Sequence, residues 1–394
     1  MIRKNPVIYL GLFQTAVNAS RTLVKNKIPV LGYDYNTKEP GFYSRLINSE
    51  TCPHPSTQED SLISFLIDRI NQLDSKPFII PATDEYLYFL NKNRAEFENI
   101  SYLLLPSGQA IDILLDKKCQ FESAGRVGLN VPPYFEFHSI EELKSEIDSI
   151  SFPVFVKPRV SFLWKNHFNN KGMLVNDKND LTKSVKSLLD KNLTFLVQEI
   201  IQGDTRNNIE VNILKLSDHT IYISTVRKIR QYPHKFGTAT SLCTISHDYL
   251  EGKLLQYINE VGITGFSNTE FIYDEKTSKY YFIETNPRIW LQIDLCEYTG
   301  DNFLMNAYKH VTGIQYNGRT KNDKEVLWVD PASDLLSLIK QGVDIHGYLS
   351  FTKNLIKAKS HGTFYWRDPV PFLRDVQWGL RLFKFMGKNK TKVY

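Results

Sequence analysis

The 394-residue sequence has only four cysteines, and no two of them form a C-x-x-C pair. Neither a disulfide framework nor a zinc ribbon is therefore indicated, and four reduced thiols fit a cytoplasmic protein. No uninterrupted apolar stretch reaches the roughly 18 residues that a membrane span needs, and the apolar run near the amino terminus is too short for the core of a signal peptide. We therefore expect a soluble protein.

The net charge is also small, because 48 Lys and Arg against 43 Asp and Glu leave only +5. Such a small excess gives no sign of nucleic-acid binding, and we expect no nucleic-acid partner. The H-E-x-x-H, G-x-S-x-G and P-loop signatures are missing, which argues against a zinc hydrolase, an α/β-hydrolase and a P-loop enzyme. The G-x-G-x-x-G fingerprint is absent too, so a dinucleotide site is not favoured.

Hydrophobic periodicity predicts a βαβ opening followed by further strands and helices. The length fits two to four domains or one enzyme body built from subdomains, and we favour the second. Polar residues Thr83, Asp84 and Glu85 follow a predicted strand at its carboxyl end, where ligands are often contacted. The main predicted strands are 7–13, 29–33, 78–81, 102–105, 152–157, 194–201, 268–273 and 280–284, and the main predicted helices are 16–27, 61–73, 111–125, 139–149, 181–189 and 247–261.

A predicted hairpin near residue 280 carries the most informative pattern. If Tyr273 lies opposite Tyr281, Glu270 lies opposite Glu284 on one face of the sheet. Two carboxylates so placed repel each other unless a cation lies between them, and Asn286 projects to the same side. These three side chains offer only oxygen ligands, which suit Mg²⁺ held together with phosphate. A slipped register or a solvated acidic face is the alternative.

Cationic residues gather at two other places. Alternation puts Lys228 and Arg230 on one strand face, where two like charges need an anion, although an exposed basic strand is the alternative. Arg288, just beyond Pro287, is placed to face a phosphate or a developing negative charge.

The hairpin residues resemble the metal-binding signature of ATP-grasp enzymes. They read Glu270-Phe-Ile-Tyr-Asp and Tyr-Phe-Ile-Glu284-Thr-Asn286-Pro-Arg288. Asp116-Lys117, Phe155-Val-Lys157-Pro158 and Val197-Gln198-Glu199-Ile-Ile201-Gln-Gly203 are similar to the two phosphate-binding lysines and the adenine-binding hinge of that superfamily. Arg230-Gln-Tyr-Pro233, followed by Gly237-Thr, resembles a stretch of carboxylate-amine ligases from amino-acid and surface-polymer pathways.

The resemblance implies an α/β (α+β) architecture, the ATP-grasp fold, in which two antiparallel-sheet subdomains clasp ATP. We expect a Rossmann-like pre-ATP-grasp domain over 1–110 and a central subdomain over 111–195. A C-terminal subdomain with the metal hairpin would follow over 196–320, and an extension with a basic aromatic helix over 321–394.

The same resemblance implies roles for individual residues. Lys117, Lys157 and Lys171 would hold phosphate, and Gln198, Glu199 and Ile201 would meet adenine. Asp204 or Glu210 would take the ribose. Glu270, Glu284 and Asn286 would bind Mg²⁺, or Mn²⁺ in its place. Lys228 and Arg230 would hold phosphate or acyl phosphate, and Arg230 and Arg288 would stabilise the oxyanion.

One loop departs from the family pattern. Residues 161–172 stand where related enzymes carry a glycine-rich flap over the phosphates, yet they contain a single glycine. Either a lid of different shape uses Lys165, His167 or Lys171, or the nucleotide site is weakened. We favour the first interpretation.

The implied activity is that of an ADP-forming carboxylate-amine ligase. A substrate carboxylate attacks the γ-phosphate of ATP, and an amine then displaces phosphate from the acyl phosphate to form an amide or peptide-like bond. The acid and the amine would be small molecules or polymer-linked groups. A catalytically inactive nucleotide-binding module and an ATP-grasp enzyme that activates bicarbonate are the alternatives. Because Glu284→Gln relieves repulsion, it should abolish turnover without lowering the melting temperature.

The carboxyl-terminal stretch 366–394 is aromatic and basic. We favour packing of this stretch on the enzyme body over an amphipathic helix that rests on the inner face of an anionic membrane. A homodimer is also compatible with the sequence.

Overall fold

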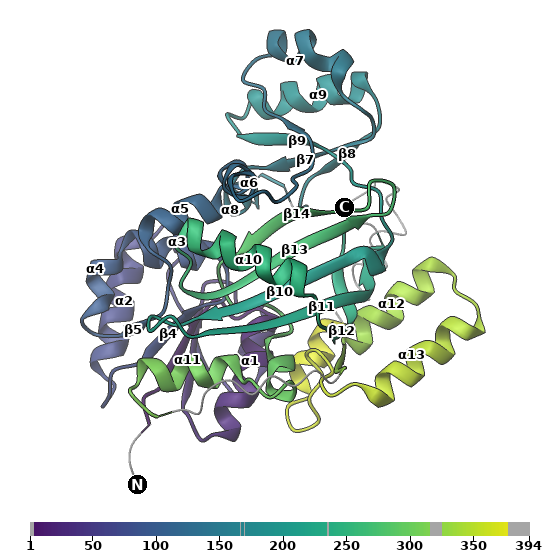
Figure 1. Ribbon diagram of the computed structural model, residues 1–394. Coiled ribbons are helices and arrows are strands. Elements are labelled where there is room, and N and C mark those ends of the chain that lie inside the picture. Colours follow the sequence, from purple (N-terminus) through teal and green to yellow (C-terminus); the bar gives the residue numbers. More distant parts are fainter. Residues whose placement is uncertain (1–3, 166, 169, 235, 316–324, 377–394) are drawn as a thin grey trace.

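The computed structural model describes residues 4–376 except 166, 169, 235 and 316–324. Three β-sheets organise the chain: a five-stranded, a four-stranded and a six-stranded sheet. Figure 1 shows the four-stranded sheet above the edge of the six-stranded sheet, with the amino-terminal sheet and its helices on the opposite side. The layout matches the predicted ATP-grasp architecture.

The amino-terminal sheet is parallel, with the strand order β3-β2-β1-β4-β5. Its central strand is apolar throughout and fully buried, because helices cover both faces of the sheet. The predicted Rossmann-like unit is therefore present, with a further strand, β3, that periodicity had not indicated. Its elements are β1 (Val7–Leu10), α1 (Gln14–Lys25), β2 (Val30–Asp34), η1 (Pro40–Tyr43), β3 (Asn48–Thr51), α2 (Glu59–Asn71), β4 (Phe78–Pro81), α3 (Asp84–Lys92), α4 (Arg94–Glu98) and β5 (Tyr102–Leu103).

The central sheet has the order β6-β9-β7-β8, and its pairings are antiparallel. Apolar faces of α7 and α9 pack on one side of it. The predicted boundary at 195/196 falls inside β9, which pairs with β6 and β7, so the central unit extends to Glu199. Its elements are β6 (Tyr134–Phe135), α7 (Ile140–Glu146), η2 (Ile147–Ser149), β7 (Val154–Pro158), α8 (Ser161–Lys165), β8 (Met173–Val175), α9 (Lys178–Leu189) and β9 (Phe195–Glu199).

The six-stranded sheet is antiparallel, in the order β14-β13-β10-β11-β12-β15. Alternate apolar residues of β10 share a buried cluster with the apolar side of α10, so the polar residues between them face the other way. Its elements are η3 (Thr205–Asn207), β10 (Asn208–Lys215), β11 (Ile221–Tyr232), β12 (Thr238–Ile245), α10 (Asp248–Val261), β13 (Gly265–Asp274), β14 (Lys279–Asn286) and β15 (Leu327–Val329).

The helix predicted over 111–125 is two helices, α5 (Gly108–Leu115) and α6 (Lys117–Arg126). Asp116 interrupts it, because its carboxylate accepts a hydrogen bond from the Lys118 backbone N–H at 2.9 Å and so caps α6. The same carboxylate binds the Arg159 guanidinium, with Nε 3.0 Å from Oδ2. This break starts α6 at Lys117, whose side chain can then enter the site.

The carboxyl-terminal part is built into the body. Strand β15 pairs with β12, and the buried Asp368 accepts hydrogen bonds from Ser44 Oγ at 2.5 Å and the Arg45 backbone N–H at 3.2 Å. Asp368 thus ties the described part of 366–394 to the first unit, and residues 377–394 lie outside the described residues. No helix within the described ranges has the length and apolar character to cross a membrane. The remaining elements are η4 (Ile293–Tyr298), α11 (Phe303–Val311), α12 (Pro331–Gln341) and α13 (Ile345–Lys357).

Candidate active site

Two rows of polar side chains cross three neighbouring strands of the six-stranded sheet. The register aligns Glu210, Glu270 and Glu284 in one row. It aligns Asn212, Asn268 and Asn286 in the next row, and Asn268 Nδ2 lies 2.8 Å from Asn212 Oδ1 and 3.0 Å from Glu210 Oε2. Sequence reasoning missed Asn212 and Asn268. The signal was present as one spacing that recurs in three strands: Glu210-x-Asn212, Asn268-x-Glu270 and Glu284-x-Asn286.

The predicted pairing of Glu270 with Glu284 is confirmed, but the register that led to it is wrong. Tyr273 lies opposite Tyr280, not Tyr281. A β-bulge between Glu270 and Phe271 shifts the pairing by one residue and brings the two glutamates opposite each other. The predicted register was wrong by one residue at the tyrosines, and the prediction also lacked the one-residue bulge. These two errors cancel, so the predicted pairing of Glu270 with Glu284 is still correct.

Lys228 lies between two of the carboxylates. Its Nζ is 2.9 Å from Glu270 Oε2 and 3.4 Å from Glu210 Oε1, and the Lys228 side chain is only 5% exposed. Burial opposes the charge, but the two carboxylates outweigh it and raise the pKa of Lys228 above its usual value. Lys228 and Glu210 thus hold each other inside the sheet, and their predicted roles on a phosphate and on the ribose stay predictions.

Arg230 does not share an anion with Lys228, because register shifts on both sides of it interrupt the alternation of β11. Its Nε lies 2.8 Å from Asp334 Oδ1 and its Nη2 lies 2.6 Å from Asp334 Oδ2. Asp334 lies on α12 and is fully buried. The Arg230 guanidinium thus anchors α12 to the sheet, and its predicted role at the acyl phosphate stays a prediction.

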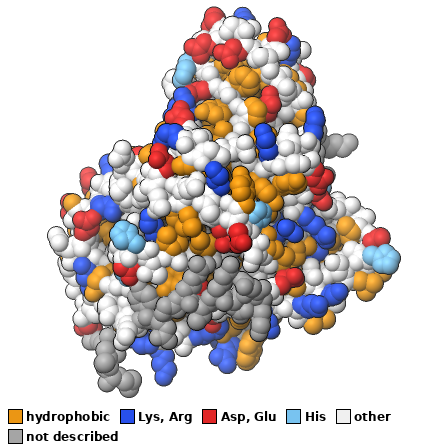
Figure 2. Space-filling model, in the orientation of Figure 1, with side chains coloured by type: hydrophobic (Ala, Val, Ile, Leu, Met, Phe, Trp, Pro, Cys, Tyr) orange, Lys and Arg blue, Asp and Glu red, His pale blue; other side chains and the backbone are white. Residues whose placement is uncertain are grey.

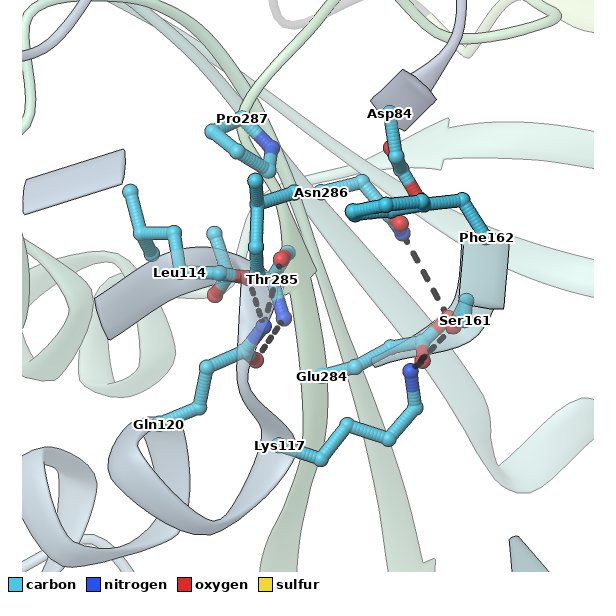
Figure 3. A pocket seen from close by; sticks show the side chains of 11 residues that line it. Asp84, Leu114, Lys117, Gln120, Ser161, Phe162, Glu284, Thr285, Asn286 and Pro287 are labelled. Atoms are coloured by element: carbon cyan, nitrogen blue, oxygen red, sulfur yellow. Dashed lines mark hydrogen bonds and ion pairs between the residues drawn. The ribbon is translucent and has the colours of Figure 1, made fainter. Parts of the chain in front are cut away.

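Glu284 faces Lys117 of α6 (Figure 3), and the charges of Lys157 and Lys171 also act on it. Lys117 Nζ is 3.3 Å from Glu284 Oε2 and 2.7 Å from Ser161 Oγ. Burial alone would raise the pKa of Glu284, but Lys117, Lys157 and Lys171 lower it to about 2. The carboxylate is therefore charged and already compensated, and on this ground we expect its neutralisation to lower the melting temperature rather than leave it unchanged or raise it.

Lys157 is a buried cation without an acidic partner. It is the last residue but one of β7 and is 6% exposed, and its Nζ lies 4.6 Å from the centre of the Phe121 ring. Among the described residues no carboxylate lies within ion-pair distance of it. Burial and the charge of Lys117 lower its pKa to about 7, against the pull of Glu284 and Glu270. Such a site favours an anionic ligand, because a negative charge beside Lys157 stabilises its protonated form.

We expect a polyphosphate ligand to bind with uptake of a proton above neutral pH. Above its pKa of about 7 Lys157 is mostly neutral in the free protein, and a phosphate beside it raises that pKa again. Calorimetric titration with ATP at pH 8 should therefore give binding enthalpies that differ between HEPES and Tris buffers in proportion to the buffer ionisation enthalpy.

The matched control is Lys157→Arg, whose guanidinium stays charged throughout this pH range. It should bind ATP with the same enthalpy in both buffers. Equal enthalpies for the wild-type protein would show that Lys157 keeps its proton before the ligand arrives.

A small pocket lies beside Glu284, between the first unit and the six-stranded sheet (Figure 3). Arg288 Nε binds Asp84 Oδ1 at 2.6 Å across its edge. Thr83 caps α3 instead, and Glu85 accepts a hydrogen bond from Ser56 Oγ at 2.7 Å, so neither lines it. Sequence reasoning missed several lining residues, and no local motif marked them. The pocket is lined by Asp84, Leu114, Leu115, Lys117, Gln120, Ser161, Phe162, Glu284, Thr285, Asn286 and Pro287.

The glycine-poor loop contains a short helix, α8, whose Trp164 is buried and packs on Phe168. Lys171 Nζ lies 3.3 Å from Thr238 Oγ1, so this segment reaches across to the six-stranded sheet. Its one glycine, Gly172, is required because a Cβ there would lie 2.5 Å from the Val156 carbonyl oxygen. His167 is exposed, and the Lys165 side chain lies outside the described residues.

The predicted adenine hinge begins at the end of β9 and continues beyond it. Gln198 is buried with an unpartnered Oε1, and the Glu199 backbone N–H donates to the Pro133 carbonyl at 2.9 Å. The Glu199 carboxylate accepts a hydrogen bond from the Ser151 backbone N–H at 3.3 Å. Asp204 is exposed and caps η3, and Ile201 is half-buried. Their contacts with adenine and ribose stay predictions.

Fold and site together define an ATP-grasp protein, in which two antiparallel sheets enclose a group of lysines and acidic residues. Residues 116–317, just over half of the chain, match the family described as "Carbamoyl-phosphate synthase L chain, ATP binding domain". The chain belongs to this family.

Individual relatives are distant. The chain is similar to the carbamoyl phosphate synthase large chain of Rubrobacter xylanophilus, at 25% identity over 44% of this chain and 17% of that protein. It thus spans about a sixth of that relative's length. D-aspartate ligase of Enterococcus faecium is 21% identical over 89% of this chain and 86% of the relative. The crystal structure of an L-amino acid ligase from Bacillus licheniformis superposes with a TM-score of 0.62, at 18% identity over 83% of this chain and 80% of that chain.

Proposed function

We propose that this protein is an ATP-dependent carboxylate-amine ligase that works through an acyl phosphate and releases ADP. The observation that carries the proposal is the acidic pair Glu270 and Glu284 facing the lysines of α6 and β7. Opposite charges packed this closely suit a ligand that is both anionic and metal-bound, as a magnesium nucleotide is. The names of the two ligases above support the same reaction class.

The donor set fits magnesium. Within the described part of the chain no three or more His, Cys, Asp and Glu residues are grouped so that they could hold a metal by themselves. Glu270, Glu284 and the Asn286 amide oxygen would therefore share the ion with phosphate oxygens, which is the usual binding mode of Mg²⁺. When bound, the ion would neutralise charge on the β- and γ-phosphates.

The chain's own groups would then act by position and charge. Lys117 and Lys157 hold the phosphates while a substrate carboxylate oxygen attacks the γ-phosphorus and the bond to ADP breaks. The amine next attacks the acyl carbon, the amide bond forms, and phosphate leaves. Arg288 is placed to stabilise the oxyanion of that step once it exchanges Asp84 for the substrate.

The proposal is tested by ADP release with Mg-ATP and hydroxylamine across pools of amino acids, uronic acids and small peptides. Hydroxylamine traps an acyl phosphate as a hydroxamate, which mass spectrometry identifies. We expect a hydroxamate in one pool. ADP release that depends on bicarbonate alone would favour activation of bicarbonate, and ATP binding without ADP release in any pool would favour an inactive nucleotide-binding module.

We expect Arg288→Lys to lower kcat by about 100-fold while ATP affinity stays near the wild-type value. A lysine keeps the positive charge but lacks the planar guanidinium group, which can release Asp84 and donate hydrogen bonds to the oxyanion. Kinetics with saturating ATP and direct ATP binding separate the two effects. A parallel loss of ATP affinity would assign Arg288 to the nucleotide rather than to the acyl group.

A further inference from the structure

Helix α13 carries an unpartnered apolar face at the edge of the molecule. Ile345, Leu349 and Ile356 are 67%, 59% and 79% exposed, although they are among the most hydrophobic side chains of the helix. At about 100° per residue they fall within a sector of about 40°, and we call these three residues the apolar stripe. The half-buried Tyr348, Phe351 and Leu355 lie on another side of the helix, so the stripe is not needed to hold α13 in place.

The stripe has a basic border. Lys353 and Lys357 are exposed and lie on the helix within about 100° of the stripe. Side chains of this kind extend from the edge of an apolar face towards a polar boundary. Figure 2 shows hydrophobic and basic side chains next to each other over the edge that α12 and α13 occupy in Figure 1.

Carboxylates do not balance this charge. Within residues 331–376, all of which the structure describes, six Lys and Arg accompany four Asp. Asp334 and Asp368 are buried, Asp375 is half-buried, and only Asp344 is exposed, where it caps α13. The surface of the extension is therefore apolar and cationic.

We propose that the apolar stripe and its lysines dock α13 onto an anionic lipid surface. A helix of 13 residues, about 20 Å long, lies in a membrane interface when its apolar side enters the acyl boundary and its lysines reach the headgroups. A second copy of the chain fits less well, because two such faces would bring lysines against lysines. The surface lies outside the candidate active site, so the proposal does not depend on the ligase activity.

The test is co-sedimentation of the full chain with vesicles. We expect binding to phosphatidylcholine vesicles that contain about one third phosphatidylglycerol, little binding to phosphatidylcholine alone, and weaker binding as salt increases. The double variant Leu349→Glu, Ile356→Glu should lose at least about tenfold in vesicle affinity. Its melting temperature and its activity without vesicles should equal the wild-type values, because both positions are exposed and remote from the site.

Matched controls separate the stripe from general effects of charge. Ile314→Glu changes another exposed isoleucine, 45% exposed after α11, and should bind like wild type. Lys353→Glu with Lys357→Glu should weaken binding and flatten its salt dependence, whereas Lys183→Glu with Lys191→Glu, on the exposed surface of the central unit, should not.

Three results would overturn the proposal. The first is absence of wild-type binding to the anionic vesicles. The second is unchanged binding of the Leu349→Glu, Ile356→Glu variant, which would place the contact elsewhere in the chain. The third is a wild-type dimer in sedimentation velocity that this variant dissociates, which would make the stripe a protein interface.

Discussion

Glu284→Gln is expected to lower Mg-ATP turnover by at least about 1000-fold. The substitution keeps the shape of the side chain but removes the charge that faces Lys117, Lys157 and the proposed metal. Steady-state ADP release at saturating ATP measures the loss. The melting temperature of the free protein should fall by a few degrees, because a carboxylate whose pKa is lowered to about 2 contributes stability at neutral pH.

The sign of that contribution gives a second measurement. Since the folded-state pKa lies below the unfolded value, the stability from Glu284 is present above the unfolded pKa near 4.5 and is lost as the pH falls towards 2. The melting temperatures of wild type and Glu284→Gln should thus converge in acid. Glu275→Gln, in the loop of the same hairpin, is the matched control and should retain activity. If Glu284→Gln turned over ATP as fast as the wild-type protein, Glu284 would not be a metal ligand.

Lys228→Met is expected to destabilise the protein by about 3–5 kcal/mol. The variant leaves Glu210 without its cation at 6% exposure, and it leaves Glu270 facing two carboxylates of the same row. Denaturant unfolding, followed by tryptophan fluorescence, measures the change. Removing the cation beside a buried carboxylate costs far more than breaking an exposed ion pair does.

Rescue distinguishes charge from packing. Adding Glu210→Gln to Lys228→Met removes one of the two uncompensated charges and should recover part of the lost stability, because Asn268 can still bind the amide. Lys183→Met, at a 79% exposed lysine, should change stability by less than about 0.5 kcal/mol. A Lys228→Met protein as stable as this control would mean that the carboxylates are protonated or hydrated.

Local sequence patterns indicated much of the fold. The strand 78–81 and the helices around 16–27 and 247–261 were predicted close to their observed positions, because each buries a face with a clear period. Local patterns failed where a single side chain ends a helix or where pairing with a distant strand determines that a segment is a strand. Asp116 ends a helix that periodicity continued, and β15, which no local pattern indicated, pairs with β12 far back along the chain.

For the site, the sequence was strongest at the hairpin. Glu270, Glu284 and Asn286 share one short segment, so alternation alone places them on one face. The lysines at 117 and 157 were indicated only by resemblance, and their approach to Glu284 required three separate elements to pack together. The bulge that corrects the hairpin register has no signal in the residues around it.

The sequence by itself determined which residues carry charge at strand ends and which strands alternate, since these depend on neighbours within a few positions. Only the tertiary structure decided which of those charges are left for a ligand. Lys228 and Arg230 are two residues apart, yet one is neutralised by Glu210 and Glu270 and the other by Asp334, 104 residues away. Lys157 has no such partner among the described residues. A cation's function depends on the carboxylates that folding brings within about 4 Å, and distance along the chain does not fix that.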